Sequence, residues 1–237
     1  MAGKLSLPLA IVMVSVSACA ASDGGATPEQ RMNEGFAMLA ESSLKYRGQV
    51  ELNVSGVTIA KPVEQAEGLK GQMGSASAVQ ASLEADPFLT AKQLSETKKT
   101  VVSSRIDQAA RERVYVAKLD GQDWKKAVEQ NWQSQLAEAE RQAVYTPAQT
   151  LSSTSATRLT EERLRIVNRA KERLASLLPT LSAESTCTAA MDRYSGKLLR
   201  LKVETVLTYR ENDAEKKETI TSAFDFPEAA SSRTNRQ

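Results

Sequence analysis

The sequence predicts an α+β fold, in which an antiparallel β-sheet is covered by amphipathic helices. Apolar and polar residues alternate over 46–57 and 196–226, as they do in strands with one buried face. Apolar residues recur at helical spacing over 125–145 and 160–179. The chain has 237 residues, of which 41% are hydrophobic and 25% charged, a composition typical of a folded soluble protein. One domain is the default at this length, although two small domains would also fit.

A helix is expected at the start of the folded region. Thr27 is suited to the N-cap and Pro28 to the first helical position. Met32, Phe36 and Leu39 then follow at helical spacing, which gives this helix one apolar face.

Strands are expected next. Val50, Leu52 and Val54 alternate with polar residues, so they share one face of a half-buried strand. A second strand is predicted over 79–84, before Pro87 breaks the run.

The segment 98–124 predicts two further strands and a turn. Val114 and Val116 lie on one face of the second strand. Asp120 and Gly121 then form a dipeptide that is typical of a tight turn.

Two helices are predicted in the following part of the chain. The first covers 125–145, where helix formers surround the apolar positions, and it is interrupted at Pro147. The second begins with Thr160 as N-cap, continues with two acidic residues and stops at Pro179.

The last third predicts two or three strands that complete the sheet. A turn at Gly196 leads into a long alternating strand, in which Leu201 and Val203 face one way. A polar turn over 212–217 then returns the chain, with Phe224 and Phe226 on one face of the final strand. Residues 228–237 have little to bury and are expected to be disordered.

The amino terminus has the pattern of an export signal. Lys4 precedes an apolar run that is shorter than the roughly 20 residues of a spanning helix. Residues 16–19, VSAC, resemble the lipobox of bacterial lipoproteins, in which the cysteine sulfur carries a diacylglycerol group. We therefore expect a signal peptide over 1–18, lipidation of Cys19 and a flexible tether over 19–29.

Other interpretations of Cys19 are an ordinary signal peptide with an incidental cysteine, or a buried core thiol. Because Ala20, rather than an aspartate, follows Cys19, the resemblance implies localisation to the outer membrane in a bacterium with two membranes. In a bacterium with one membrane, the protein would face outward from the cell membrane. Cys187 is the other cysteine, and it is interpreted as an isolated buried thiol.

The composition argues against several function classes. The chain has no histidine, which removes the commonest general base and the usual metal ligand. It also lacks a Gly-rich phosphate loop, a GxSxG motif and a cluster of metal ligands. We therefore do not expect the protein to be an enzyme or to bind a cofactor or a metal. Lysine and arginine number 31 against 29 acidic residues, so nucleic acid is not an expected partner.

The mature chain resembles bacterial envelope lipoproteins of the LolA/LppX-like fold. The resemblance rests on the lipobox, the order of elements and two segments, VYVAKLDGQDWKK over 114–126 and DRYSGKLLRLKVE over 192–204. It implies that residues 30–227 form a curved half-barrel, with helices packed across its concave face. The Ala, Ser and Gly-rich segment 58–98 and an aromatic content of 5% depart from this pattern.

The resemblance implies a membrane-anchored, extracytoplasmic protein that carries a lipid or another apolar ligand in the half-barrel. The alternative is an envelope interaction or assembly module with a collapsed pocket, which presents a sheet edge or helix face to a protein partner. The same alternating residues would then be ordinary core. The residues expected on the concave face are Val50, Leu52, Val54, Val114, Val116, Leu201, Val203, Phe224 and Phe226.

Overall fold

The computed structural model describes residues 25–64, 83–144, 153–227 and 229. The helices in this part of the chain are α1 (Pro28–Ala40), α2 (Pro87–Glu96), α3 (Gly121–Val144) and α4 (Ser153–Leu177). A short 3₁₀ helix (Leu178–Thr180) follows α4. The strands are β1 (Arg47–Val54), β2 (Val57–Glu64), β3 (Lys99–Asp107), β4 (Glu112–Leu119), β5 (Ser182–Asp192), β6 (Leu198–Glu211) and β7 (Ala214–Asp225).

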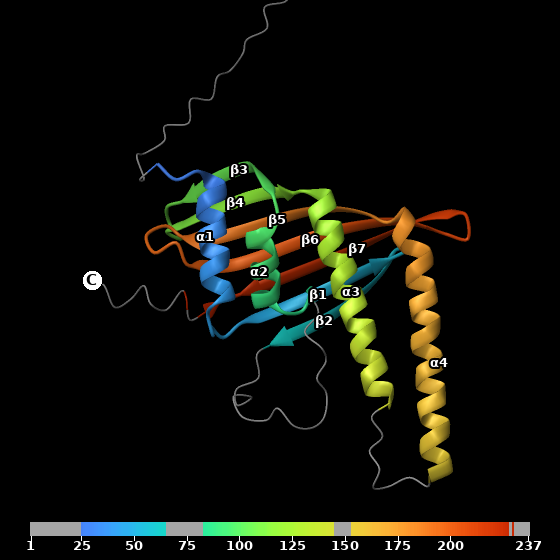
Figure 1. Ribbon diagram of the computed structural model, residues 1–237. Helices are drawn as coiled ribbons and strands as arrows, with labels where there is room; N and C mark the ends of the chain where they lie inside the picture. The colour runs from blue at the N-terminus through green and yellow to red at the C-terminus, as the bar shows by residue number, and fades with distance from the viewer. Residues whose placement is uncertain (1–24, 65–82, 145–152, 228, 230–237) are drawn as a thin grey trace, which may run out of the picture.

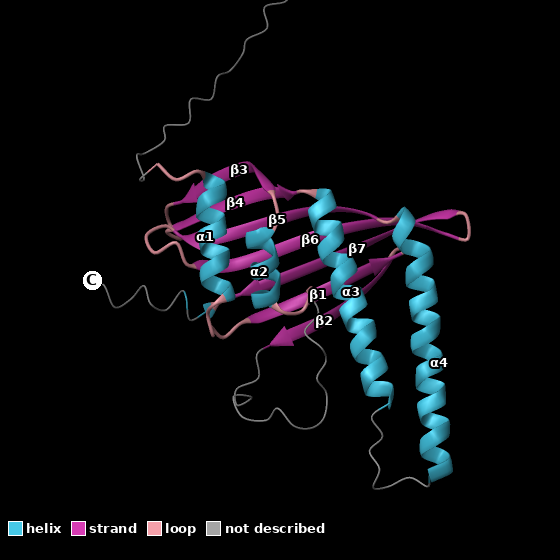
Figure 2. Cartoon of the chain, viewed as in Figure 1, coloured by secondary structure: helices cyan, strands magenta, loops and turns pink. Residues whose placement is uncertain are grey.

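The described strands form one antiparallel sheet in the order β2-β1-β7-β6-β5-β4-β3 (Figure 2). The edge strands β2 and β3 do not pair with each other, so the curved sheet stays open. The four described helices lie on one face of this sheet (Figure 1). The α+β class and the half-barrel with helices across its concave face are therefore confirmed.

The predicted start of α1 is confirmed in detail. The hydroxyl of Thr27 accepts a hydrogen bond from the backbone N–H of Gln30 at 3.2 Å, and the Gln30 side chain accepts one from Thr27 N–H at 2.7 Å. This capping box satisfies two backbone donors that the helix cannot pair itself. Met32 and Phe36 are fully buried, which places the apolar face of α1 against the sheet.

Polar contacts attach α1 to the edge strand β3. The carboxylate of Glu29 accepts a hydrogen bond from the backbone N–H of Val101 at 3.1 Å. The ammonium group of Lys99 donates to the side chain of Asn33 and lies 5.8 Å from the ring centroid of Phe36. Because Glu29 belongs to α1, the packed domain begins before the predicted boundary at residue 30.

The strand β2 and the helix α2 were not predicted. Ser55 and Gly56 connect β1 to β2 with positive φ angles of 51° and 84°, which suit a tight hairpin turn. The side chain of Asp86 caps α2 by accepting hydrogen bonds from the N–H groups of Phe88 and Leu89. Pro87 is therefore the first residue of a helix.

Three local predictions are corrected. The predicted strand over 79–84 lies mostly outside the described residues, and Leu83 lies in a turn. Asp120 and Gly121 do not form a hairpin turn, since the Asp120 carboxylate accepts hydrogen bonds from the second and third residues of α3 at 3.0 and 2.9 Å. Thr160 is inside α4, where its hydroxyl donates to the carbonyl of Ala156 at 3.0 Å.

The C-terminal hairpin forms as predicted. β7 pairs with β6 over the whole length of β7, with Leu201 opposite Phe224. Asn212 and Asp213 form the turn with φ angles of 52° and 62°, the conformation that matches the twist of a two-residue hairpin. Ala229 is 2% exposed and belongs to the core, so the packed domain extends past the predicted boundary at residue 227.

The long helices α3 and α4 form an antiparallel pair. They have 24 and 25 residues, about 36 Å at the usual helical rise. Lys171 of α4 contacts Glu140 of α3 at 2.6 Å. One end of the pair lies over the sheet, and the other end projects past the edge strand β2 (Figure 1). The surface that this pair shares with the sheet is therefore a candidate binding region.

Candidate functional site

The central residues predicted for the concave face lie in a packed core. Leu201, Val203 and Phe224 share the helix-covered face of the sheet, and Phe226 follows directly after β7. Their exposed fractions are 1%, 4%, 1% and 1%, and each belongs to the main hydrophobic cluster. They stabilise the fold and are not accessible to a ligand.

The predicted residues of β1 lie on the same face but are less covered. Val50 is opposite Ser222 of β7, and Leu52 is opposite Ile220. With Val54 they are half-buried. The structure therefore brings the β1 residues to the helix-covered face, toward the open side of the half-barrel.

Val114 and Val116 lie on the other face of the sheet, contrary to the prediction. Tyr115 and Ala117 of the same strand belong to the core, and Ala117 is opposite Cys187. Side chains alternate across a strand, so Val114 and Val116 point away from the helices. Both faces of β4 are apolar, and the alternating pattern therefore could not decide which face is covered.

The centre of the half-barrel has no room for an acyl chain in the described structure. A space of only about 10 Å³ remains where α3 crosses the sheet, beside Trp124, Val128 and Val203. This is about the volume that holds one water molecule, far less than an acyl chain requires. Ligand binding in the centre would require the helices to move.

A larger open groove lies between α4, α3 and the ends of β6 and β7. Its volume is about 480 Å³, within the range of small-molecule sites. We call it the hairpin groove; its residues are Trp132, Arg169, Ala170, Arg173, Leu174, Leu177, Tyr209 and Glu218.

Polar contacts fix one wall of the hairpin groove. The hydroxyl of Tyr209 donates to the carboxylate of Glu218 at 2.5 Å. Burial, together with the hydrogen bond to Glu218, raises the pKa of Tyr209 to about 12. Arg173 donates to Glu211 at 2.8 Å, which attaches α4 to the end of β6.

Apolar surface extends from the hairpin groove in two directions. A second space of about 280 Å³ lies between α3 and α4, and Leu174 lines both spaces. On the sheet, Glu218 is opposite Val54 of β1, which is opposite Val57 of β2. Val57 and Ile59 are 64% and 61% exposed, so this side of the half-barrel has an apolar surface that the described helices do not cover.

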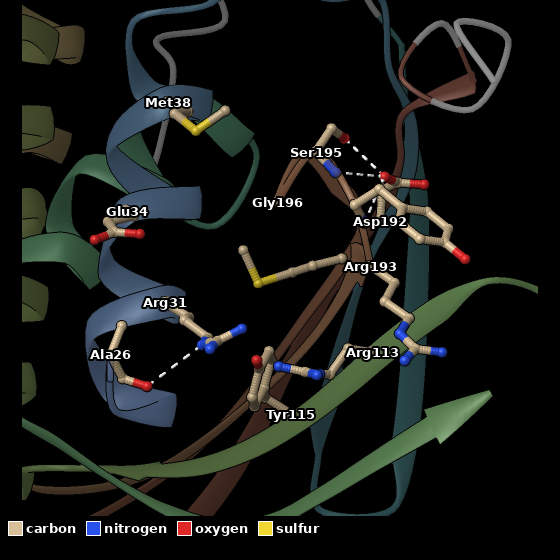
Figure 3. A pocket seen from close by; sticks show the side chains of 12 residues that line it. Ala26, Arg31, Glu34, Met38, Arg113, Tyr115, Asp192, Arg193, Ser195 and Gly196 are labelled. Carbon is tan, nitrogen blue, oxygen red and sulfur yellow. Dashed lines mark hydrogen bonds between the residues drawn. The ribbon is translucent and has the colours of Figure 1, made fainter. Parts of the chain in front are cut away.

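A separate polar pocket lies at the other end of the sheet, between α1, β4 and the β5–β6 turn (Figure 3). Its volume is about 390 Å³. We call it the arginine pocket, because Arg31, Arg113 and Arg193 line it. Buried Tyr115 and Met191 also line it, together with the exposed side chains of Met38 and Tyr194. Sequence reasoning did not single out these arginines, which come from three distant segments.

The second cysteine is buried as predicted. Cys187 is free and 0% exposed on the helix-covered face of β5. Burial raises the pKa of its thiol to about 12, although the charge of Lys99 opposes this shift. Cys19 lies outside the described residues.

The described segments lack two other features. No group of three or more His, Cys, Asp or Glu side chains there is arranged to hold a metal ion. Within the same segments, no helix combines the length and the hydropathy needed to span a membrane.

Comparison of the chain with protein-family models, with curated proteins and with solved structures gave no match.

Proposed function

We propose that the protein is a lipid-anchored, extracytoplasmic lipoprotein that binds the acyl chain of an anionic amphiphile in the hairpin groove. The observation that carries this proposal is the composition of the groove. Trp132, Leu174 and Leu177 provide apolar surface, and Arg169 and Arg173 stand on α4 beside them. An acyl chain with a carboxylate or phosphate head matches both features.

The groove differs from the central cavity that the family resemblance implies. The central residues Leu201 and Val203 are packed under α3. The open side, by contrast, has half-buried Leu52 and Val54 beside exposed Val57. A chain bound there would remove apolar surface from water, at about 25 cal/mol for each Å² buried.

The two tryptophans make the binding test specific. Trp132 lines the hairpin groove, whereas Trp124 is 3% exposed in the core. We define the anchor-free chain as residues 20–237, which retain all described residues. Brominated fatty acids should quench the fluorescence of this chain. Quenching should persist in Trp124→Phe and disappear in Trp132→Phe, with circular dichroism confirming that both variants fold.

A pair of substitutions on α4 tests the groove itself. Leu174→Glu places a charge inside the groove and should abolish quenching of Trp132. Ile166→Glu is the matched control, because Ile166 is 59% exposed on the same helix and does not line the groove. Equal quenching in both variants would contradict the proposed site.

The membrane anchor requires its own test, since Cys19 lies outside the described residues. In a bacterial host, Cys19→Ser should remove the lipid and shift the protein out of the detergent-extracted membrane fraction. Mass spectrometry of the unaltered protein should show a diacylglycerol-modified N-terminal cysteine. Retention of Cys19→Ser in the membrane would argue against this anchor.

A second candidate function is an envelope interaction module, and the filled centre of the half-barrel favours it. In that case the end of the α3–α4 pair that projects past β2 would contact a protein (Figure 1). Anchor-free chain purified from its host would then give native mass spectra without lipid, and brominated fatty acids would leave Trp132 unquenched. Leu174→Glu would have no effect on either measurement.

A further inference from the structure

An acidic side chain lines the hairpin groove, and the proposed function does not use it. Glu218 of β7 lies in the groove together with Arg169 and Arg173 of α4. The arginines suit the anionic head of an amphiphile, but a carboxylate repels a ligand whose only charge is negative. The presence of Glu218 therefore indicates that the head group also carries a positive charge.

The neighbours of Glu218 do not neutralise it. It lies opposite Val54 of β1 and opposite Leu207 of β6, so apolar side chains flank it on both adjacent strands. Lys216 shares this face of β7, but it is exposed and forms no ion pair with the described residues. The only side-chain partner of Glu218 in the described segments is the hydroxyl of Tyr209, at 2.5 Å. A half-buried carboxylate in these surroundings favours a cation beside it.

The charges of Glu218 and Arg173 are near each other, because both act on the hydroxyl of Tyr209. Burial and the hydrogen bond to Glu218 raise the pKa of Tyr209, whereas the positive charge of Arg173 lowers it. Arg173 is held by Glu211, to which its Nε donates at 2.8 Å. The terminal N–H groups of this guanidinium can still bind an oxyanion. A phosphate on Arg173 would therefore lie close to a cation on Glu218.

The aromatic residues of the groove favour an ammonium group as this cation. Trp132 and Tyr209 line the groove together with Glu218. The faces of aromatic rings attract ammonium groups, and tryptophan does so most strongly. A metal ion would need more carboxylate ligands, and no suitable group of three occurs in the described segments.

We propose that the hairpin groove binds an aminophospholipid, with the ammonium group on Glu218 and the phosphate on Arg169 and Arg173. The acyl chain would lie on the apolar surface of the groove. This inference rests on the proposed function, because it concerns the same site. It narrows the ligand to an amphiphile whose phosphate is accompanied by an ammonium group. Phospholipids with a glycerol head group, which lack this cation, should bind more weakly.

The test compares two lysophospholipids that have the same brominated acyl chain. Lysophosphatidylethanolamine carries an ammonium group, and lysophosphatidylglycerol does not. Both are added below the concentration at which they form micelles, and quenching of Trp132 is measured in the anchor-free Trp124→Phe chain. Lysophosphatidylethanolamine should bind roughly tenfold more tightly. N-acetylation of its amine removes the positive charge and should abolish this preference.

Substitution of Glu218 tests the residue itself. Glu218→Gln removes the negative charge and retains the size of the side chain, so it should bind the two lipids with equal affinity. Glu215→Gln is the matched control, because Glu215 is exposed on the same strand and lies on the opposite face of the sheet. It should retain the roughly tenfold preference. Circular dichroism shows whether both variants fold.

The outcomes separate this inference from the proposed function. Equal binding of the two lipids before substitution of Glu218 would contradict the ammonium site and leave the hairpin groove in place. A preference that persists in Glu218→Gln would overturn the role of this residue. Displacement of the lipid by an equal concentration of free phosphoethanolamine would identify a site for a soluble head group. Quenching by neither lipid would contradict both the groove and this inference.

Discussion

The indole N–H of Trp124 donates a hydrogen bond to the hydroxyl oxygen of Thr205 at 2.9 Å inside the core. Trp124 lies in the first turn of α3 and Thr205 lies in β6, 81 residues along the chain. The hydroxyl of Ser185 on β5 contacts the same oxygen at 2.9 Å. The buried hydrogen bonds among Trp124, Thr205 and Ser185 therefore determine where α3 crosses the sheet. The bulk of Trp124 also helps to fill the half-barrel.

Thr205→Val should destabilise the protein although it preserves the shape of the side chain. The substitution leaves the buried N–H of Trp124 without its acceptor, which costs about 1–3 kcal/mol. Urea unfolding of the anchor-free chain measures the change in the free energy of unfolding. Thr205→Ser retains the hydroxyl and should lose less. Equal losses in the two variants would show that the methyl group, and not the hydrogen bond, is important here.

Gly48→Ala should also destabilise the fold, for a steric reason. A Cβ atom at Gly48 would lie 2.6 Å from the carbonyl oxygen of Ala223 and 2.5 Å from the ring of Phe224. The backbone of β7 cannot move away from this Cβ atom without disturbing the β1–β7 pairing. We therefore expect the free energy of unfolding to fall by about 1–3 kcal/mol. Gln49→Ala, at the exposed neighbouring position, is the control in the same urea measurement. An unchanged unfolding midpoint in Gly48→Ala would contradict this packing.

Tyr209 should make stability depend on pH in the alkaline range. Its pKa is raised to about 12 in the folded protein, from an ordinary value of about 10, because it is buried and bonded to Glu218. Folding therefore favours the neutral hydroxyl. Its contribution is fully present below pH 10 and is lost as the pH rises through 12. The difference in free energy of unfolding between the unaltered chain and Tyr209→Phe should be constant below pH 10 and shrink above it.

Sequence periodicity predicted most elements but missed α2 and β2. Most apolar residues of β6 and β7 fall on one alternate set of positions, so pattern and fold agree. A proline can end a strand or occupy the first position of a helix. Pro87 begins a helix because the side chain of Asp86 caps it. β2 contains Pro62 and is exposed along most of its length, as an edge strand can be, so it lacks the pattern of a half-buried strand.

The candidate sites were harder to predict, because each depends on how distant segments meet. Leu201 and Phe224 were assigned to the correct face, but β4 is apolar on both faces, and only its register with β5 places Tyr115 inside. Arg31, Arg113 and Arg193 form no local motif. Their proximity follows from the position of α1 beside β4 and β5, which long-range pairing determines.

Cys187 should be unreactive in the folded protein. It is fully buried, and its thiol pKa of about 12 leaves almost no thiolate near neutral pH. In the anchor-free chain, which contains no other cysteine, a thiol reagent such as dithionitrobenzoate should react only after urea unfolds the protein. Ser195→Cys provides a control at an exposed position of the β5–β6 turn, and its new thiol should react in the native state.

Because the reagent reaches Cys187 only when the helices separate from the sheet, the rate of the Cys187 reaction should follow the opening of the core. A fast native reaction in the unaltered chain would mean that this face opens readily, and the central half-barrel would again become accessible to an acyl chain.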